Sequence, residues 1–157
     1  MTRLLLPALA LLLVPVVSAQ THAVSGTAAY IIDESQRVER PDGTHLAFVT
    51  MRAVAIEDDP ASPLHLAVDD CAGTHLFAAD GAPVQFAGIC TATDPDGDIR
   101  WYAFFNSPER TRWTCLGGTG TFEGATCEGT SEVLGVGYDS RATIRYTGEI
   151  TMPSATR

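Results

Sequence analysis

The sequence contains no lysine. All ten of its basic residues are arginines, and against nineteen acidic residues they leave a formal net charge of −9 in 157 residues. The arginines form no basic run that could neutralise a series of phosphates, so the composition predicts binding neither to nucleic acid nor to anionic membranes. The use of arginine alone also fits a bacterial genome rich in GC.

The sequence also lacks the closely spaced cysteine pairs that zinc sites use, which argues against a structural metal. Its four cysteines, Cys71, Cys90, Cys115 and Cys127, are separated by 19, 25 and 12 positions. An even number of cysteines in an exported chain predicts disulfides, for which three connectivities are open. We expect Cys71–Cys90 and Cys115–Cys127, because these pairs close the shorter loops. No metal or cofactor is expected.

Only one long apolar run is present, at residues 4–17, and it is too short to cross a membrane comfortably. Arg3 precedes the run, and small residues end it at Val17-Ser18-Ala19. This is the pattern of a secretory signal peptide at residues 1–19, cleaved after Ala19. The sequence therefore predicts a secreted or periplasmic protein whose single domain covers residues 20–157, without a membrane span.

Helical periodicity is scarce, and the mature chain alternates instead between apolar and polar residues, as half-buried strands do. Residues 141–152 are the clearest case: Ala142, Ile144, Tyr146 and Ile150 fall on one face. About eight such runs are separated by turn residues, which indicates a β-barrel or a β-sandwich. The run at 44–57 is apolar on both faces, so one face is expected in the interior and the other against a neighbouring subunit or a covering loop.

Aromatic residues on two other runs suggest a ligand pocket. Ile99, Trp101, Ala103 and Phe105 share one face of the run at 99–106, and Trp113 lies on the apolar face of a later run. We expect Trp101, Phe105 and Trp113 to face the interior, where they either line a pocket for a small apolar ligand or fill the space themselves.

One motif is specific enough to carry a resemblance. Gly117, Gly118, Gly120, Phe122 and Gly124 lie within Gly-Gly-Thr-Gly-Thr-Phe-Glu-Gly at residues 117–124, where the glycines permit a tight turn and Phe122 would plug a barrel end. The segment resembles one in the allene oxide cyclase and dirigent superfamily of small β-barrels. The resemblance implies an all-β fold, a single eight-stranded antiparallel barrel, here with two disulfides. Because such barrels are commonly oligomeric, it also implies a homo-oligomer, a trimer or dimer.

No catalytic residue is assigned, because the polar positions of the plant cyclases have no match here. The acidic stretches at 94–98 and 69–70 are expected to be a solvated turn and a solvated strand end. The sequence therefore favours an exported, non-catalytic barrel that binds a small apolar ligand or a protein partner. The alternatives are an isomerase or cyclase acting on an oxidised lipid-like substrate and a structural envelope protein. A carboxylate or a tyrosine–acid pair inside the barrel would favour the enzyme.

Overall fold

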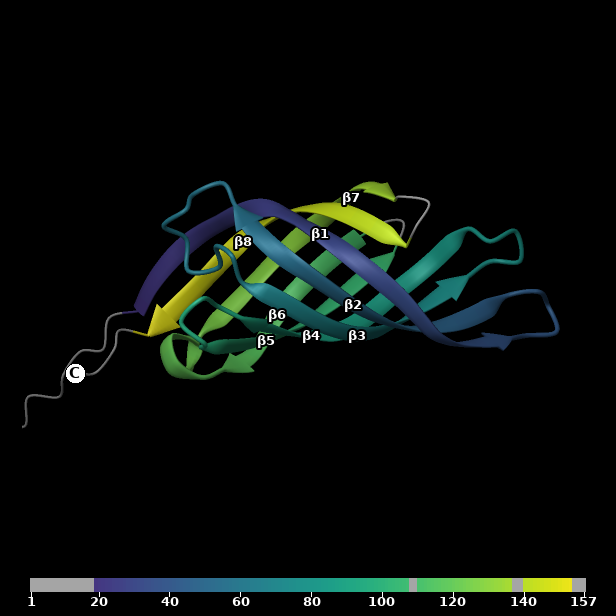
Figure 1. Ribbon diagram of the computed structural model, residues 1–157, viewed down its shortest axis with the longest axis horizontal. Coiled ribbons are helices and arrows are strands. Elements are labelled where there is room, and N and C mark those ends of the chain that lie inside the picture. Colours follow the sequence, from purple (N-terminus) through teal and green to yellow (C-terminus); the bar gives the residue numbers. More distant parts are fainter. Residues whose placement is uncertain (1–18, 108–109, 137–139, 154–157) are drawn as a thin grey trace, which may run out of the picture.

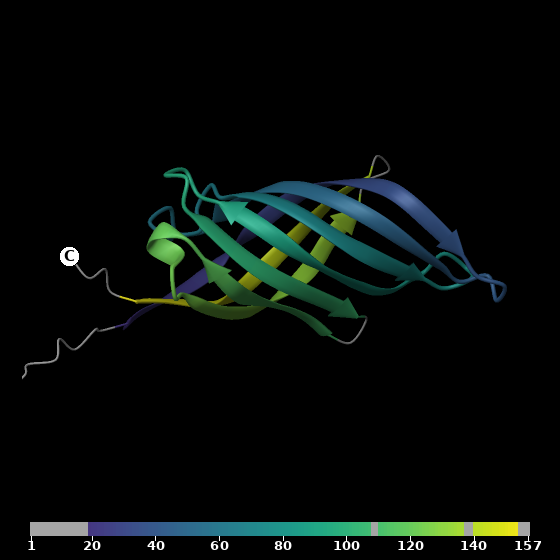
Figure 2. The ribbon, with the colours of Figure 1, turned by 90° about the horizontal axis from the view of Figure 1, so that it is seen from below.

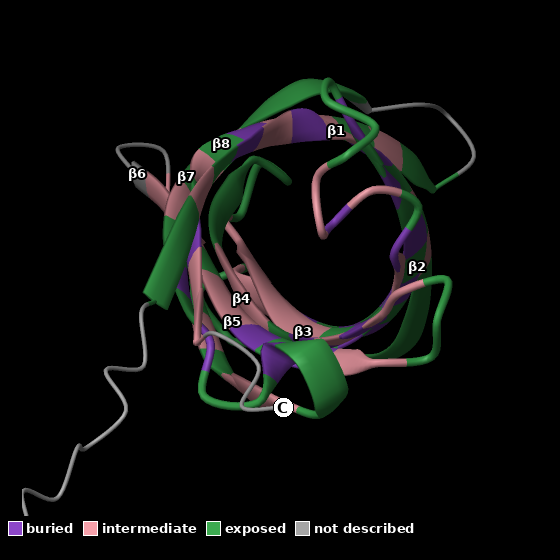
Figure 3. Ribbon diagram, turned by 90° about the vertical axis from the view of Figure 1, so that its left-hand side faces the viewer, coloured by how far each residue is buried: buried purple, intermediate pink, exposed green. Residues whose placement is uncertain are grey.

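The strands close into one antiparallel barrel in a computed structural model that describes residues 19–107, 110–136 and 140–153. Each strand pairs with its neighbours in chain order, and β8 pairs with β1 to complete the ring (Figures 1 and 3). This confirms the predicted fold class. The eight strands are β1 (Ala19–Glu39), β2 (His45–Glu57), β3 (Val68–Phe77), β4 (Pro83–Thr93), β5 (Ile99–Ser107), β6 (Arg110–Gly118), β7 (Thr126–Val136) and β8 (Arg141–Pro153).

The predicted signal peptide lies, except for Ala19, outside the described residues, and its cleavage stays a prediction. Within the ranges that the structure describes, no helix has the length and hydropathy needed to cross a membrane.

Alternate side chains point into the barrel, as the period of two requires. On β2 the inward residues are small or slim, and Ala47, Ala53 and Ala55 are at most 4% exposed, whereas Val54 and Ile56 on the outer face are 42% and 53% exposed. On β8 the alternation places Ile150 inside, as predicted. The small side chains on β2 leave room in the interior that larger ones would fill.

The prediction for β5 is wrong by one residue, which reverses its faces. Arg100 and Tyr102 are 5% and 7% exposed and face inward, whereas Trp101 and Phe105 are 38% and 46% exposed on the outer face. Both faces of this strand carry aromatic residues, so hydrophobicity alone could not identify the inner one. Strand pairing decides which face of β5 is buried, because Arg100 is opposite the buried Ala92 of β4.

Both predicted disulfides are confirmed. Cys71 and Cys90 are directly opposite each other on β3 and β4, and Cys115 is bonded to Cys127 across β6 and β7. The first pair faces the interior, where both cysteines are buried. Each bond ties two neighbouring strands and shortens the unfolded chain's free loop, which stabilises the barrel.

The glycine motif forms a turn at one end of the barrel. After β6 the chain turns through a short 3-10 helix, η1 (Gly120–Phe122), which lies at the end where β1 begins and β8 ends (Figure 2). Gly120 and Gly124 have φ angles of 56° and 72°, which favour glycine, and Phe122 is 2% exposed. The Asp98 carboxylate accepts a hydrogen bond from the Thr121 amide, so the acidic turn at 94–98 is tied to the glycine turn.

The segment 58–67 also covers this end. Leu64 is 2% exposed, and Leu66 has a φ of 61°, which is unusual for a residue with a side chain. At the opposite end, the β1–β2 and β3–β4 hairpins project beyond the rest of the barrel (Figure 1). The two ends therefore differ: one carries η1 and the segment 58–67, with Phe122 and Leu64 buried, and the other carries the two projecting hairpins.

Candidate functional site

A cavity of about 720 Å³ occupies the barrel interior. Its lining includes Phe77 and Pro83 from the projecting hairpins and Leu64 from the segment 58–67 at the opposite end, so it extends between the two ends. Aliphatic and aromatic side chains make up most of its walls, with polar groups at a few places. A concave, mainly apolar site with a few polar groups is typical of a pocket for one small molecule.

A row of polar residues crosses the deep part of the pocket, near Leu64. Five residues are in register across five neighbouring strands. They are Tyr30 on β1, Ala53 on β2, Asp69 on β3, Ala92 on β4 and Arg100 on β5. The two alanines separate the three polar residues. Because alanine is short, neighbouring polar side chains can approach each other above it.

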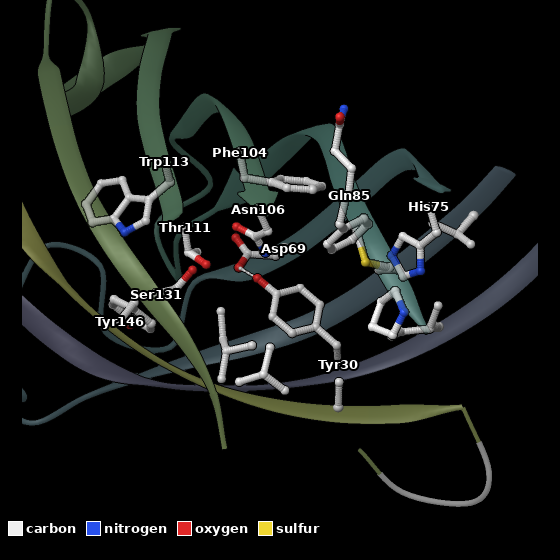
Figure 4. A pocket seen from close by; sticks show the side chains of 18 of the residues that line it. Tyr30, Asp69, His75, Gln85, Phe104, Asn106, Thr111, Trp113, Ser131 and Tyr146 are labelled. Carbon is white, nitrogen blue, oxygen red and sulfur yellow. Dashed lines mark hydrogen bonds between the residues drawn. The ribbon is translucent and has the colours of Figure 1, made fainter. Parts of the chain in front are cut away.

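Asp69 is the buried acid of this row, with 3% of its surface exposed. The Tyr30 hydroxyl donates a hydrogen bond of 3.3 Å to its Oδ2 (Figure 4). Its Oδ1 is also buried but has no hydrogen-bond partner. Burial raises the pKa of the Asp69 carboxyl, although the positive charge of Arg100 and the hydroxyls of Tyr102 and Tyr30 act in the opposite direction.

Arg100 and Tyr102 complete this group. The Arg100 guanidinium lies over the Tyr102 ring, 4.7 Å from its centroid, and its Nε is buried without a hydrogen-bond partner. The hydroxyls of Tyr102 and Tyr30 are 3.4 Å apart. Burial raises the pKa of both tyrosines, so both hydroxyls keep their protons. The group thus contains an unused acceptor, Oδ1 of Asp69, and an unused donor, Nε–H of Arg100.

A second buried acid, Glu57, belongs to the end of β2. Glu57 and Tyr146 of β8 both pair in register with Gly26 of β1, and the Tyr146 hydroxyl donates to Glu57 Oε1 across this glycine. A Cβ atom at Gly26 would lie 2.7 Å from the Tyr146 hydroxyl oxygen, so the bridge requires glycine. The Ser25 amide donates to the other carboxylate oxygen at 3.1 Å. Both oxygens of Glu57 therefore have partners.

Aromatic rings surround His75 near the projecting hairpins. Its ring meets Phe86 edge-on with centroids 3.7 Å apart and lies 5.6 Å from Phe77, which stacks on His45. The Nε2 of His75 is buried without a partner. Burial lowers the pKa of His75 to about 4, against the opposing effect of Glu34. A neutral imidazole therefore belongs to the apolar wall at neutral pH.

The structure brings only one of the three predicted aromatic residues into the pocket. Trp113 lines it and donates from Nε1 to the Thr130 carbonyl at 3.2 Å, while Trp101 and Phe105 lie on the outer face of β5. Space for the Trp113 ring comes from Gly129 and Gly148, where a Cβ atom would lie 2.2 and 2.5 Å from it.

The sequence analysis missed the deep polar row. Asp70 is an exposed strand residue that pairs with Arg52, but its neighbour Asp69 is buried, so the prediction of a solvated strand end is wrong for Asp69. One signal was available: Asp69 stands two positions before the inward-facing Cys71. Within the ranges that the structure describes, no cluster of three or more His, Cys, Asp or Glu residues could hold a metal ion.

The fold is similar to that of solved dirigent proteins. No family model matches the chain, and no curated protein matches its sequence. The pterocarpan synthase dirigent protein GePTS1 superposes with a TM-score of 0.57 at 12% identity, covering 94% of this chain and 99% of that one. The dirigent protein PsPTS1, also a pterocarpan synthase, gives 0.57 at 14% identity, covering 87% and 97%. The chain therefore has the dirigent-like barrel fold that its glycine motif predicted.

Proposed function

We propose that the barrel binds one small, mainly apolar organic molecule whose polar group reaches the deep part of the pocket. The observation that carries the proposal is the unpartnered Oδ1 of Asp69 at the end of a largely apolar cavity of about 720 Å³. A buried polar atom without a partner costs free energy, and a ligand that satisfies it recovers that cost. The Nε–H group of Arg100, which also has no partner, would donate a hydrogen bond to an acceptor of the ligand.

The test is direct titration with a broad panel of lipids and other apolar compounds, followed by native mass spectrometry and tryptophan emission. Trp113 lines the pocket and Trp101 does not, so a Trp101→Phe background isolates the reporting residue. Binding should change the emission and raise the melting temperature. If no compound of the panel has either effect, the barrel is not a binding module for such molecules.

A matched pair of variants ties binding to the cavity. Ala142 lines the pocket, and the next residue, Thr143, is exposed on the outer face of β8. Ala142→Phe should fill the cavity and abolish binding, whereas Thr143→Phe should leave it unchanged. Equal binding by both variants would mean that the ligand sits elsewhere.

The alternative function is proton-transfer catalysis, in an isomerase or cyclase acting on an oxidised lipid-like substrate. The tyrosine–acid pair Tyr30–Asp69, enclosed by the barrel, supports it. A carboxyl whose pKa is raised by burial retains its proton to higher pH and can act as a general acid. Incubation with an epoxy fatty acid, followed by product analysis, tests it: turnover should disappear in Asp69→Asn while binding remains.

The same proposal includes export and assembly. Cleavage after Ala19 would leave β1 beginning at Gln20, which pairs with Met152 on β8, so the barrel would stay closed. The N-terminal sequence of the secreted protein tests this cleavage.

For assembly, we propose a homo-oligomer that covers exposed apolar side chains on the outer faces of β2, β4, β5 and β6. These include Val54, Ile89, Phe105 and Leu116, which are 42% to 58% exposed. Light scattering should detect the oligomer, and Phe105→Arg should weaken it. A protein that stays monomeric at high micromolar concentration contradicts the assembly.

A further inference from the structure

A second set of polar side chains lines the pocket on β5, β6 and β7. Asn106 on β5 is directly opposite Thr111 on β6, and Ser131 on β7 is directly opposite Tyr146 on β8. Figure 4 shows Thr111 and Ser131 pointing toward one another at the pocket wall. Asn106, Thr111 and Ser131 thus form a polar row across three neighbouring strands, and all three line the cavity.

The protein itself leaves this polar row largely unsatisfied. The Oδ1 of Asn106 is buried and has no hydrogen-bond partner. No other residue in the described part of the chain hydrogen-bonds to the side-chain hydroxyl of Thr111 or Ser131. In a barrel whose walls are mainly apolar, the hydroxyls of Thr111 and Ser131 are not needed for packing, because valine and alanine would fill nearly the same space as threonine and serine.

The wall on the other side of the barrel has the opposite character. The residues of β2 that line the pocket, Ala47, Val49, Met51 and Ala55, all have aliphatic side chains. Viewed along the barrel axis, β2 lies across the ring from β6 and β7 (Figure 3). The pocket is therefore two-sided along its length, in addition to having polar groups at its deep end.

We infer that the row of Asn106, Thr111 and Ser131 recognises hydroxyl or carbonyl groups along one edge of the ligand. The inference rests on the proposed function and narrows it. The preferred ligand is an extended hydrocarbon skeleton with one apolar side, a polar group at its deep end and a second polar group further along one edge. Thr111 and Ser131 can each donate and accept a hydrogen bond, and Asn106 can also do both, so a hydroxyl at that edge is satisfied in either role.

Decan-1-ol and the series of 1,n-decanediols test the inference by calorimetric titration. These probes are neutral, so their binding does not depend on charge repulsion from the acidic protein. All of them offer one terminal hydroxyl to the deep end, and the diols place a second hydroxyl at successive distances from it. We expect one narrow range of n to bind about 3- to 10-fold more tightly than decan-1-ol, as one or two added hydrogen bonds would give.

The double variant Thr111→Val/Ser131→Ala should lose this preference while it binds decan-1-ol as well as the unmodified protein does. The matched control is Thr126→Val/Thr143→Val, which changes exposed positions on the outer faces of β7 and β8 and should keep the preference.

Two results overturn the inference, and they are distinguishable. In the first, decan-1-ol binds but no diol is preferred, or the preference survives in the double variant. The row of Asn106, Thr111 and Ser131 then does not recognise a second hydroxyl on the ligand, and only this inference is wrong. If neither decan-1-ol nor any diol binds, the proposed apolar ligand itself is wrong, and the inference is wrong with it.

Discussion

The two buried acids differ in how their oxygens are satisfied. Glu57 is 4% exposed and Asp69 is 3% exposed, so burial does not separate them. Glu57 has a partner for each oxygen, the Tyr146 hydroxyl and the Ser25 amide. Asp69 has the Tyr30 hydroxyl on one oxygen and nothing on the other.

This difference indicates two roles. A carboxylate whose hydrogen bonds are complete within the protein joins strands, and Glu57 joins β2, β1 and β8. A carboxylate that is buried but incomplete has not been optimised for stability, and its free oxygen is available to a ligand. Burial alone would therefore have assigned the same role to both acids, and the hydrogen-bond partners separate them.

Isosteric amides test the comparison most strongly. Glu57→Gln replaces the carboxylate by a neutral amide, so the Ser25 amide loses its carboxylate acceptor and the Tyr146 hydroxyl must reverse from donor to acceptor. We expect a loss of about 2 kcal/mol in the free energy of unfolding, measured by urea denaturation at pH 7. Asp69→Asn keeps an acceptor for Tyr30 and should not lower stability at that pH. Equal losses in the two variants would contradict the assignment.

Removing the partner hydroxyls should give a smaller effect in the same direction. Tyr146→Phe leaves Glu57 without one of its two donors and should cost about 1 to 1.5 kcal/mol in thermal or urea unfolding. Tyr30→Phe removes two long hydrogen bonds, of 3.3 Å to Asp69 and 3.4 Å to the Tyr102 hydroxyl, and should cost less than about 0.5 kcal/mol. Its main effect should be on ligand affinity, and a reversed order of stabilities would undermine the comparison.

The pH dependence of stability should reveal Asp69. Its pKa is raised above the ordinary 3.8, so the unfolded chain loses this proton first as the pH rises. The stability linked to the neutral carboxyl is complete below about pH 3.8 and is lost as the pH rises through the folded pKa. Asp69→Asn should therefore gain stability relative to the unmodified protein between pH 4 and 7. A difference that stays constant across this range would show that the carboxyl is not perturbed.

His75 should show the opposite dependence. Its folded pKa is about 4, below the ordinary 6.5, so the unfolded chain takes up the proton first as the pH falls. The stability linked to neutral His75 is complete above about pH 6.5 and is lost as the pH falls toward 4. His75→Gln should flatten the stability profile in this window, with His45→Gln as the control. Parallel profiles for the unmodified protein and His75→Gln would mean that the aromatic wall does not exclude the charged imidazole.

Local pattern was sufficient wherever a strand has one clearly apolar face. The alternation on β8 placed Ile150 inside, and the turn between Cys115 and Cys127 was enough to pair them. Local pattern failed on β5, where aromatic residues occupy both faces. It also failed at Asp69, because one residue of the pair Asp69-Asp70 points inward and the other outward. In both cases the composition of the segment is ambiguous, and the neighbouring strands decide which face is buried.

The sequence by itself determined the class of the fold, the disulfides and the glycine turn after β6, because each depends on residues close together in the chain or on a period of two. Only the tertiary structure decided which polar residues meet inside. Tyr30, Asp69 and Arg100 come from strands far apart in the sequence, and they form one row because the pairing of each strand with the next sets the register from β1 to β5. A shift of one residue in any of those pairings would turn a member of the row toward the solvent.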